Sequence, residues 1–266
     1  MRKVTLEYKR LLRWVNTDIM VPESWRELSA SQFVAVCHLY LGDGSEESFI
    51  SAFFSLPLGI IRRMDSYHRF KLSELVQWIS DFCAPHNTFL IPELSGHLYA
   101  PDPKLKGVCL QQFVMADTFF IRYMSSKDDM DLNRMISCLY LRSNECFFIE
   151  QAPTRRHWWN KDLKILDIEE RSGELSSLNK DLRYAIFLNF ILIKNWLSKA
   201  FPYLFQESGD TPPVKKHVKP PVNWIKVLDA FVGDKITEYD KFLMLPATTA
   251  FRIMNTRIME GLKHGR

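Results

Sequence analysis

Apolar residues recur at helical spacing along most of this chain, and the clearest stretch follows Ser29. Its apolar members fall at i, i+3, i+4, i+7 and i+8, namely Phe33, Val36, Cys37, Tyr40 and Leu41. This spacing predicts one apolar face of a helix that stops at Gly42. Ser29 and Gln32 form a capping-box pair, because the serine hydroxyl and the glutamine amide can satisfy each other's backbone donors. A helix is therefore expected to begin at Ser29.

Similar apolar stripes predict the other helices. They cover residues 45–56, 72–79, 108–124, 129–141, 174–200, 224–232 and 251–262. The stretches over 108–124 and 129–141 are expected to pack as an antiparallel pair. On the first of them the apolar face is predicted to consist of Phe113, Ala116, Phe120 and Met124.

Only the start of the chain has a β pattern. Residues 4–8 alternate between apolar and polar, and residues 16–22 offer a second short extended stretch, so a small hairpin is predicted within residues 1–22. A proline-rich connection between residues 85 and 103 is expected to be extended, because it contains Pro85, Pro92, Pro101 and Pro103.

The predicted fold class is therefore mainly α. We expect a multi-helix, bundle-like main domain over residues 1–207, with the short β element at its N-terminus, and a small C-terminal helical unit over residues 223–266. Residues 208–222 hold four prolines and a Lys215-Lys216-His217 cluster, which is typical of a linker or a surface strap.

The composition indicates a folded protein and does not favour a nucleic-acid-binding or membrane protein. The chain has 266 residues, of which 47% are hydrophobic and 25% charged, so it can bury a sizeable core. The net charge of +4 is a small excess of 35 basic over 31 acidic residues, and it does not indicate nucleic-acid binding. The most apolar run, residues 185–193, is about half of the roughly 20 residues that a membrane span requires, and it contains Asn189. A buried helix, and no membrane contact, is expected there.

The cysteines favour a reducing compartment. There are five, an odd number, and none forms a Cys-x-x-Cys pair: Cys37, Cys83, Cys109, Cys138 and Cys146. Buried, reduced thiols fit this pattern best. The first residues lack the apolar core and small residues of a signal peptide, so a cytoplasmic protein is expected.

No pattern of catalytic or metal-binding residues stands out. No two of the seven histidines have the i, i+4 spacing of zinc ligands on one helix face. Gly42-Asp43-Gly44 is expected to be a helix-to-helix turn, and the acidic residues at 128–131 a helix N-terminus. His38 is predicted to be a hydrogen-bonded structural histidine. No cofactor, no metal and no enzymatic activity are expected, although a Cys/His nucleophile pair formed only in the fold stays open.

The candidate partner-binding residues are Arg155, Arg156, Trp158 and Trp159. Two arginines and two tryptophans in a loop combine the residue types that dominate binding energy at interfaces. In the alternative interpretation, the tryptophans pin the loop to the core and the arginines are solvated. Lys215, Lys216 and Lys219 could likewise contact phosphates or belong to a solvated linker.

Residues 21–33, Val-Pro-Glu-Ser-Trp-Arg-Glu-Leu-Ser-Ala-Ser-Gln-Phe, resemble the opening of proteins encoded in bacteriophage tail gene clusters. In those proteins a proline, a small residue, a tryptophan, an acidic residue, a leucine and a Ser or Thr lead from a short strand into the first helix. The C-terminal unit is similar too, since Trp224 opens a helix and residues 239–246 lead into the last one. The resemblance implies a helical tail-assembly chaperone that binds the tape-measure protein.

On this basis we expect a non-enzymatic protein-binding factor in the host cytoplasm. It would shield helical segments of the long tape-measure protein in an apolar groove between its own helices. Methionines such as Met115, Met124, Met135 and Met254 would give such a groove adaptable packing, or else belong to an ordinary core. The alternative is a structural component of a phage tail or injection apparatus that is retained in the virion.

Overall fold

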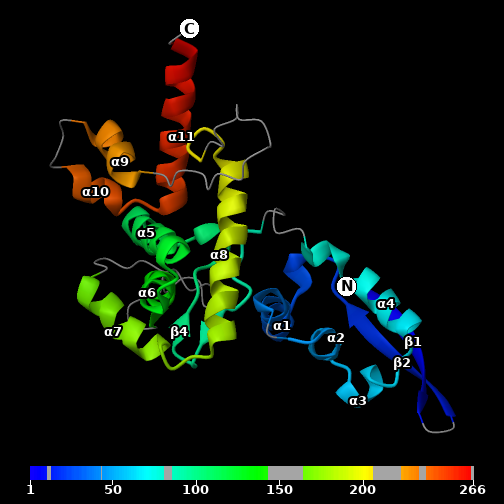
Figure 1. The fold of residues 1–266 in the computed structure, drawn as a ribbon. Helices are drawn as coiled ribbons and strands as arrows, with labels where there is room; N and C mark the ends of the chain where they lie inside the picture. The colour runs from blue at the N-terminus through cyan, green and yellow to red at the C-terminus, as the bar shows by residue number, and fades with distance from the viewer. Residues whose placement is uncertain are drawn as a thin grey trace, which may run out of the picture.

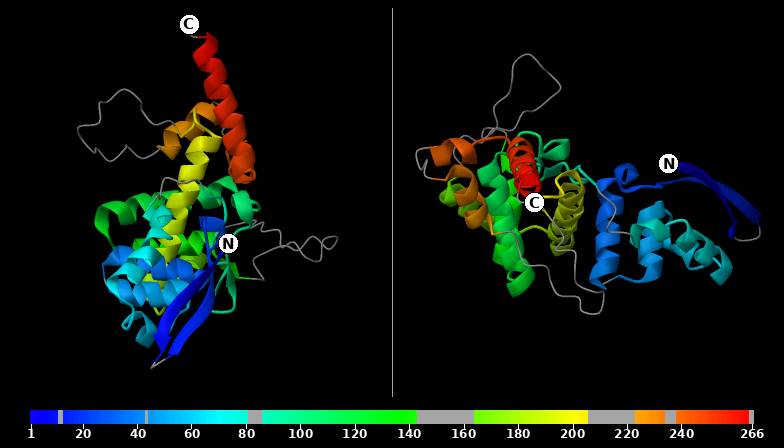
Figure 2. Two further views of the ribbon diagram at one scale, coloured as in Figure 1. Left: turned by 90° about the vertical axis from the view of Figure 1, so that its right-hand side faces the viewer. Right: turned by 90° about the horizontal axis from the view of Figure 1, so that it is seen from above.

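The computed structural model describes residues 1–10, 13–42, 44–80, 86–142, 164–205, 223–233 and 238–264, and these residues are mainly helical, as predicted. Helix α8 (Lys180–Ala200) lies at the centre of the molecule (Figure 1). The N-terminal hairpin and helices lie on one side of it, and the remaining helices lie on the other (Figure 2). The buried apolar residues form one cluster that extends from Leu6 to Met254.

The N-terminal part consists of the predicted hairpin and four helices. Strands β1 (Arg2–Arg10) and β2 (Arg13–Val21) pair antiparallel over their whole length. Short 3-10 turns lie at Trp25–Glu27 and Gln77–Ser80. The helices between these turns are α1 (Ala30–Leu41), α2 (Glu46–Phe54), α3 (Leu58–Ile61) and α4 (Ser66–Glu74).

The capping box at the start of α1 is confirmed. The backbone N–H of Gln32 donates to Ser29 Oγ at 3.2 Å, and the backbone N–H of Ser29 donates to Gln32 Oε1 at 2.9 Å. At its other end α1 stops at Gly42, whose φ of 77° lies in the left-handed region that glycine adopts without strain. The turn into α2 is thus the helix-to-helix connection that the glycines predict.

Replacing Ser29 by alanine is expected to lower the free energy of unfolding by about 1 kcal/mol, because the Gln32 N–H loses its acceptor. Urea denaturation followed by circular dichroism measures this change. The Ser29→Asp variant should lose less, since a carboxylate can accept the same bond. Equal unfolding midpoints for the alanine variant and the parent chain would contradict the expected contribution of the cap.

The connection predicted to be extended between residues 85 and 103 is described from residue 86 onward, and it contains extended strands. It holds strands β3 (Glu93–Leu94) and β4 (Leu98–Tyr99) and a 3-10 turn at Pro103–Leu105. Strand β4 pairs with β5 (Leu141–Arg142), so the three form a small antiparallel sheet in the order β3-β4-β5. Strands of two residues are too short to show an alternating pattern.

Helices α5 (Leu110–Ser126) and α6 (Asp129–Leu139) pack against each other after a two-residue connection, which confirms the predicted pair. The single helix predicted over 174–200 is instead the end of α7 (Ile165–Leu175) followed by α8. The break occurs because Asn179 caps α8, its Oδ1 accepting from the backbone N–H of Asp181 at 2.7 Å.

Helix α8 is buried, as expected for its apolar run. Its polar residue Asn189 is 1% exposed and binds the backbone of a neighbouring segment. Its Oδ1 accepts from Leu90 N at 2.6 Å, and its Nδ2 donates to Thr88 O at 3.0 Å. Among the described residues, no helix combines the length and the apolar character needed to cross a membrane.

The C-terminal helices α9 (Trp224–Val232), α10 (Tyr239–Leu243) and α11 (Ala247–His264) pack on α5. Backbone bonds fix the start of α11, since Leu110 N donates to Leu245 O and Ala247 N donates to Val108 O, both at 2.8 Å. The predicted linker or strap over 208–222 lies outside the described residues.

A candidate partner-binding groove

An apolar groove of about 490 Å³ runs between α5 on one side and α9 and α10 on the other. Half of its lining residues are aliphatic or methionine: Val114, Met115, Ile121, Ile225, Leu228 and Leu243. Ile225 is 70% exposed at the mouth of this α5–α9 groove. An open, mainly apolar groove of this kind is a candidate site for a protein partner.

The groove exists because α5 is apolar on two adjacent faces. Phe113, Ala116 and Phe120 are buried, as predicted, whereas Met124 is 39% exposed and Tyr123 is buried in its place. The neighbouring face, with Val114, Thr118 and Ile121 at i, i+4 and i+7, is only partly buried and lines the groove. This second face was not predicted from the sequence, although the spacing of those residues indicates it.

A buried carboxylate holds α9, which forms the opposite wall of the groove, in position. Asp117 of α5 is 1% exposed, and its Oδ2 accepts from the Trp224 indole N–H of α9 at 2.8 Å. Its Oδ1 forms an ion pair with Lys194 of α8. Lys194 Nζ also lies 4.5 Å from the centre of the Phe120 ring, a cation–π contact. Asp117 therefore joins three helices and sets the position of α9.

Behind that wall an aromatic cluster surrounds Phe113, which is fully buried. Its ring centre lies 4.9 Å from Phe251, 5.8 Å from Trp224, 5.9 Å from Phe190 and 6.5 Å from Phe205. Edge-on and tilted contacts of this kind add to the burial of apolar area. The cluster ties α5 and α8 to both α9 and α11.

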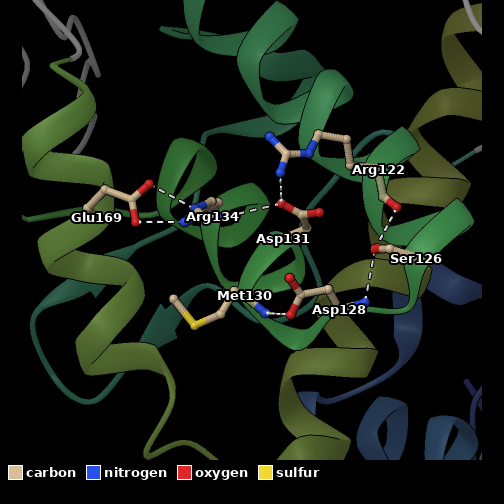
Figure 3. A network of polar contacts seen from close by, with 7 residues as sticks. All are labelled: Arg122, Ser126, Asp128, Met130, Asp131, Arg134 and Glu169. Atoms are coloured by element: carbon tan, nitrogen blue, oxygen red, sulfur yellow. Dashed lines mark hydrogen bonds and ion pairs between the residues drawn. The ribbon is translucent and has the colours of Figure 1, made fainter.

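A charged network (Figure 3) includes Arg122, which lines the groove. Arg122 of α5 forms an ion pair with Asp131 Oδ1 of α6 at 3.1 Å, and Arg134 forms one with the same oxygen at 3.3 Å. Arg134 also donates to both carboxylate oxygens of Glu169 on α7, at 2.8 and 3.1 Å. A bidentate pair of this geometry holds both side chains in fixed positions. The network therefore links α5, α6 and α7.

The acidic residues at 128–131 lie at a helix N-terminus, as predicted. Asp128 Oδ1 accepts from the backbone N–H of Met130 at 3.0 Å and caps α6 (Figure 3). Asp129 Oδ2 forms an ion pair with Arg183 of α8 at 3.3 Å. In the described part of the chain, no cluster of three or more His, Cys, Asp or Glu side chains could hold a metal ion.

The described cysteines are buried and protonated. Burial raises the pKa of the thiols of Cys37, Cys109 and Cys138, and a thiol is a weak nucleophile compared with a thiolate. These three agree with the expected buried, reduced state. Cys83 and Cys146 lie outside the described residues.

Two histidines occupy structural positions. His38 Nδ1 lies 2.9 Å from Asp181 Oδ2, so this side chain is hydrogen-bonded across α1 and α8, as predicted. His86 is 1% exposed, and burial, with the nearby charge of Arg26, lowers its pKa to about 4. A neutral imidazole is therefore expected at His86 at neutral pH.

The residues chosen from sequence as partner-binding, Arg155, Arg156, Trp158 and Trp159, lie outside the described residues, as do Lys215, Lys216 and Lys219. Among the methionines, Met115 lines the groove, whereas Met135 and Met254 are fully buried in the core.

Comparisons of this chain with family models, with curated proteins and with solved structures found no match.

Proposed function

We propose that this chain is a non-enzymatic protein-binding factor whose α5–α9 groove holds the apolar face of a partner's helix. The observation that carries the proposal is the second apolar face of α5, with Val114 and Ile121, opposite the exposed Ile225 of α9. Apolar area left open in a groove is stabilised when an amphipathic helix covers it.

The size of the groove suits a short helical segment. Its lining on α5 runs from Gln111 to Arg122, which is about 16 Å along the axis at 1.5 Å per residue. That length matches about three turns of a partner helix. The partner's apolar residues at i, i+3, i+4 and i+7 would contact the aliphatic lining.

The resemblance of residues 21–33 to proteins of phage tail gene clusters supports one choice of partner. We propose a role in phage tail assembly, in which the groove shields helical segments of the tape-measure protein in the host cytoplasm. A long helical protein exposes apolar faces before it is packed into the tail, and a transient cover would prevent its aggregation.

The matched pair Ile225→Asp and Ile165→Asp tests the groove. Ile225 and Ile165 are exposed to similar extents, 70% and 67%, but only Ile225 lines the groove. Co-expression with a tagged tape-measure protein should recover at least about tenfold less of the Ile225→Asp chain, because a charge there must lose its water on binding. The Ile165→Asp chain should be recovered like the parent. Equal recovery of both variants would contradict the proposed groove.

A structural role in the tail or injection apparatus remains the second candidate. Purified particles distinguish the two roles, because a chaperone leaves the assembled tail whereas a structural component stays at fixed stoichiometry. Quantitative mass spectrometry of particles, together with the eluate of the co-expression experiment, reports both outcomes.

A further inference from the structure

The N-terminal hairpin has two open edges. Strands β1 and β2 pair with each other at nine positions, and in the described chain neither is joined to a third strand. No backbone hydrogen bond links them to the rest of the described residues. Each strand therefore presents an outer row of N–H and C=O groups, which is a template for pairing with another strand.

The two edges differ in their chemistry. The sequence of β1 contains four basic residues and one acidic residue, a net charge of +3. In β2 the only charged residues are Arg13 and Asp18, so its net charge is zero. Strand β2 also carries Val15, Thr17 and Ile19, which favour extended structure. Lysines on an edge oppose pairing, and β2 has none. The β2 edge is therefore the one suited to a further strand.

We propose that β2 pairs antiparallel with β2 of a second copy of this chain, with Thr17 on the two-fold axis. Of the possible registers, this one aligns all nine residues of both strands. It sets Val15 opposite Ile19 of the second copy, and Asn16 opposite Asp18. A register with Asp18 on the axis would instead face two carboxylates against each other.

The cross-strand pairs in this register are favourable. Asn16 and Asp18 are exposed. Asp18 is held by Lys3 and Thr5 of its own hairpin, and each of its oxygens has a second acceptor site to which the Asn16 amide of the second copy can donate. Two β-branched side chains, Val15 and Ile19, lie opposite each other on the other face. Each of these pairs occurs twice by symmetry, because the interface uses the same surface on both copies.

The result is a four-stranded sheet in the order β1-β2-β2-β1. A two-stranded hairpin has little stability of its own, and four strands are a more stable unit. The like charges of β1 then occupy both outer edges and oppose the addition of further strands. The assembly is therefore a closed dimer and not a fibre.

Sedimentation velocity of the full chain over a range of concentrations tests the proposal through two substitutions at one exposed position. The parent chain should be a dimer that dissociates on dilution. Asn16→Asp should raise the dimer dissociation constant by about tenfold or more, because two new carboxylates face two existing ones. Asn16→Lys should leave the constant unchanged or lower it. A parent chain that is monomeric throughout, or the reverse order of the two variants, would overturn the proposal.

A pair of proline variants identifies the edge. Asn16 and Glu7 are cross-strand partners in the hairpin, so Asn16→Pro and Glu7→Pro alter the two edges at the same level. Because Arg10 pairs with Arg13 across two residues, the alternation of the antiparallel ladder is expected to turn the N–H groups of Asn16 and Glu7 outward, where proline is tolerated on an edge strand. With circular dichroism spectra like that of the parent chain, Asn16→Pro should be monomeric and Glu7→Pro dimeric. Loss of the dimer in Glu7→Pro, or its retention in Asn16→Pro, would contradict pairing through β2.

Discussion

Replacing Phe113 by alanine is expected to lower the free energy of unfolding by about 3–5 kcal/mol, the largest effect of any substitution considered for this chain. Phe113 is fully buried, and its ring contacts four aromatic residues from α8, from the segment after it, from α9 and from α11. The substitution removes the buried area of the ring and leaves a cavity that four large rings cannot fill without shifting.

Urea denaturation followed by circular dichroism measures this loss. Phe70→Ala is the matched control, because Phe70 lies on α4 and is 55% exposed, and its removal should change the unfolding free energy by less than about 0.5 kcal/mol. A Phe113→Ala chain that unfolds at the same urea concentration as the Phe70→Ala chain would contradict the central position of the aromatic cluster.

Replacing Asp117 by alanine is expected to cost about 3 kcal/mol. The change leaves the Lys194 ammonium and the Trp224 indole N–H without their shared acceptor. The estimate lies at the lower end for a broken buried pair, because the Lys194 side chain is 26% exposed and keeps part of its hydration. Asp117→Asn should lose less, since an amide oxygen can still accept from Trp224.

Thermal and urea unfolding with tryptophan fluorescence report the loss of stability and any change around Trp224. Asp229→Ala is the control, because Asp229 is an exposed carboxylate on α9. Since Asp117 sets the position of α9, the Asp117→Ala chain should also recover less of the proposed tape-measure partner in co-expression. A stable Asp117→Ala chain with unaltered fluorescence would show that α9 is held by other contacts.

The sequence correctly predicted those helix ends that depend on interactions between neighbouring residues. The capping box at Ser29 and Gln32, the glycine at the end of α1 and the acidic start of α6 involve residues within a few positions of each other. Their chemistry is fixed by neighbours in sequence, and tertiary packing did not override it.

Interactions between distant residues could not be derived in this way. The pairing of Tyr99 with Leu141 in the small sheet, and the contact of Asp117 with Trp224, join segments far apart in the chain. No spacing rule relates such residues. The candidate groove has the same origin, since its two walls come from α5 and α9.

The aromatic cluster also has a consequence for the order in which the chain acquires its structure during synthesis. The hairpin and helices α1–α4 can gather around Trp25, whose ring lies 5.4 Å from that of Trp78, as soon as residues up to Ser80 have left the ribosome. Helices α5 and α8 can complete their packing only after Trp224 and Phe251, which are synthesised much later. Until α11 emerges, the apolar surface around Phe113 stays open to water, and general chaperones of the cell can bind it in that interval.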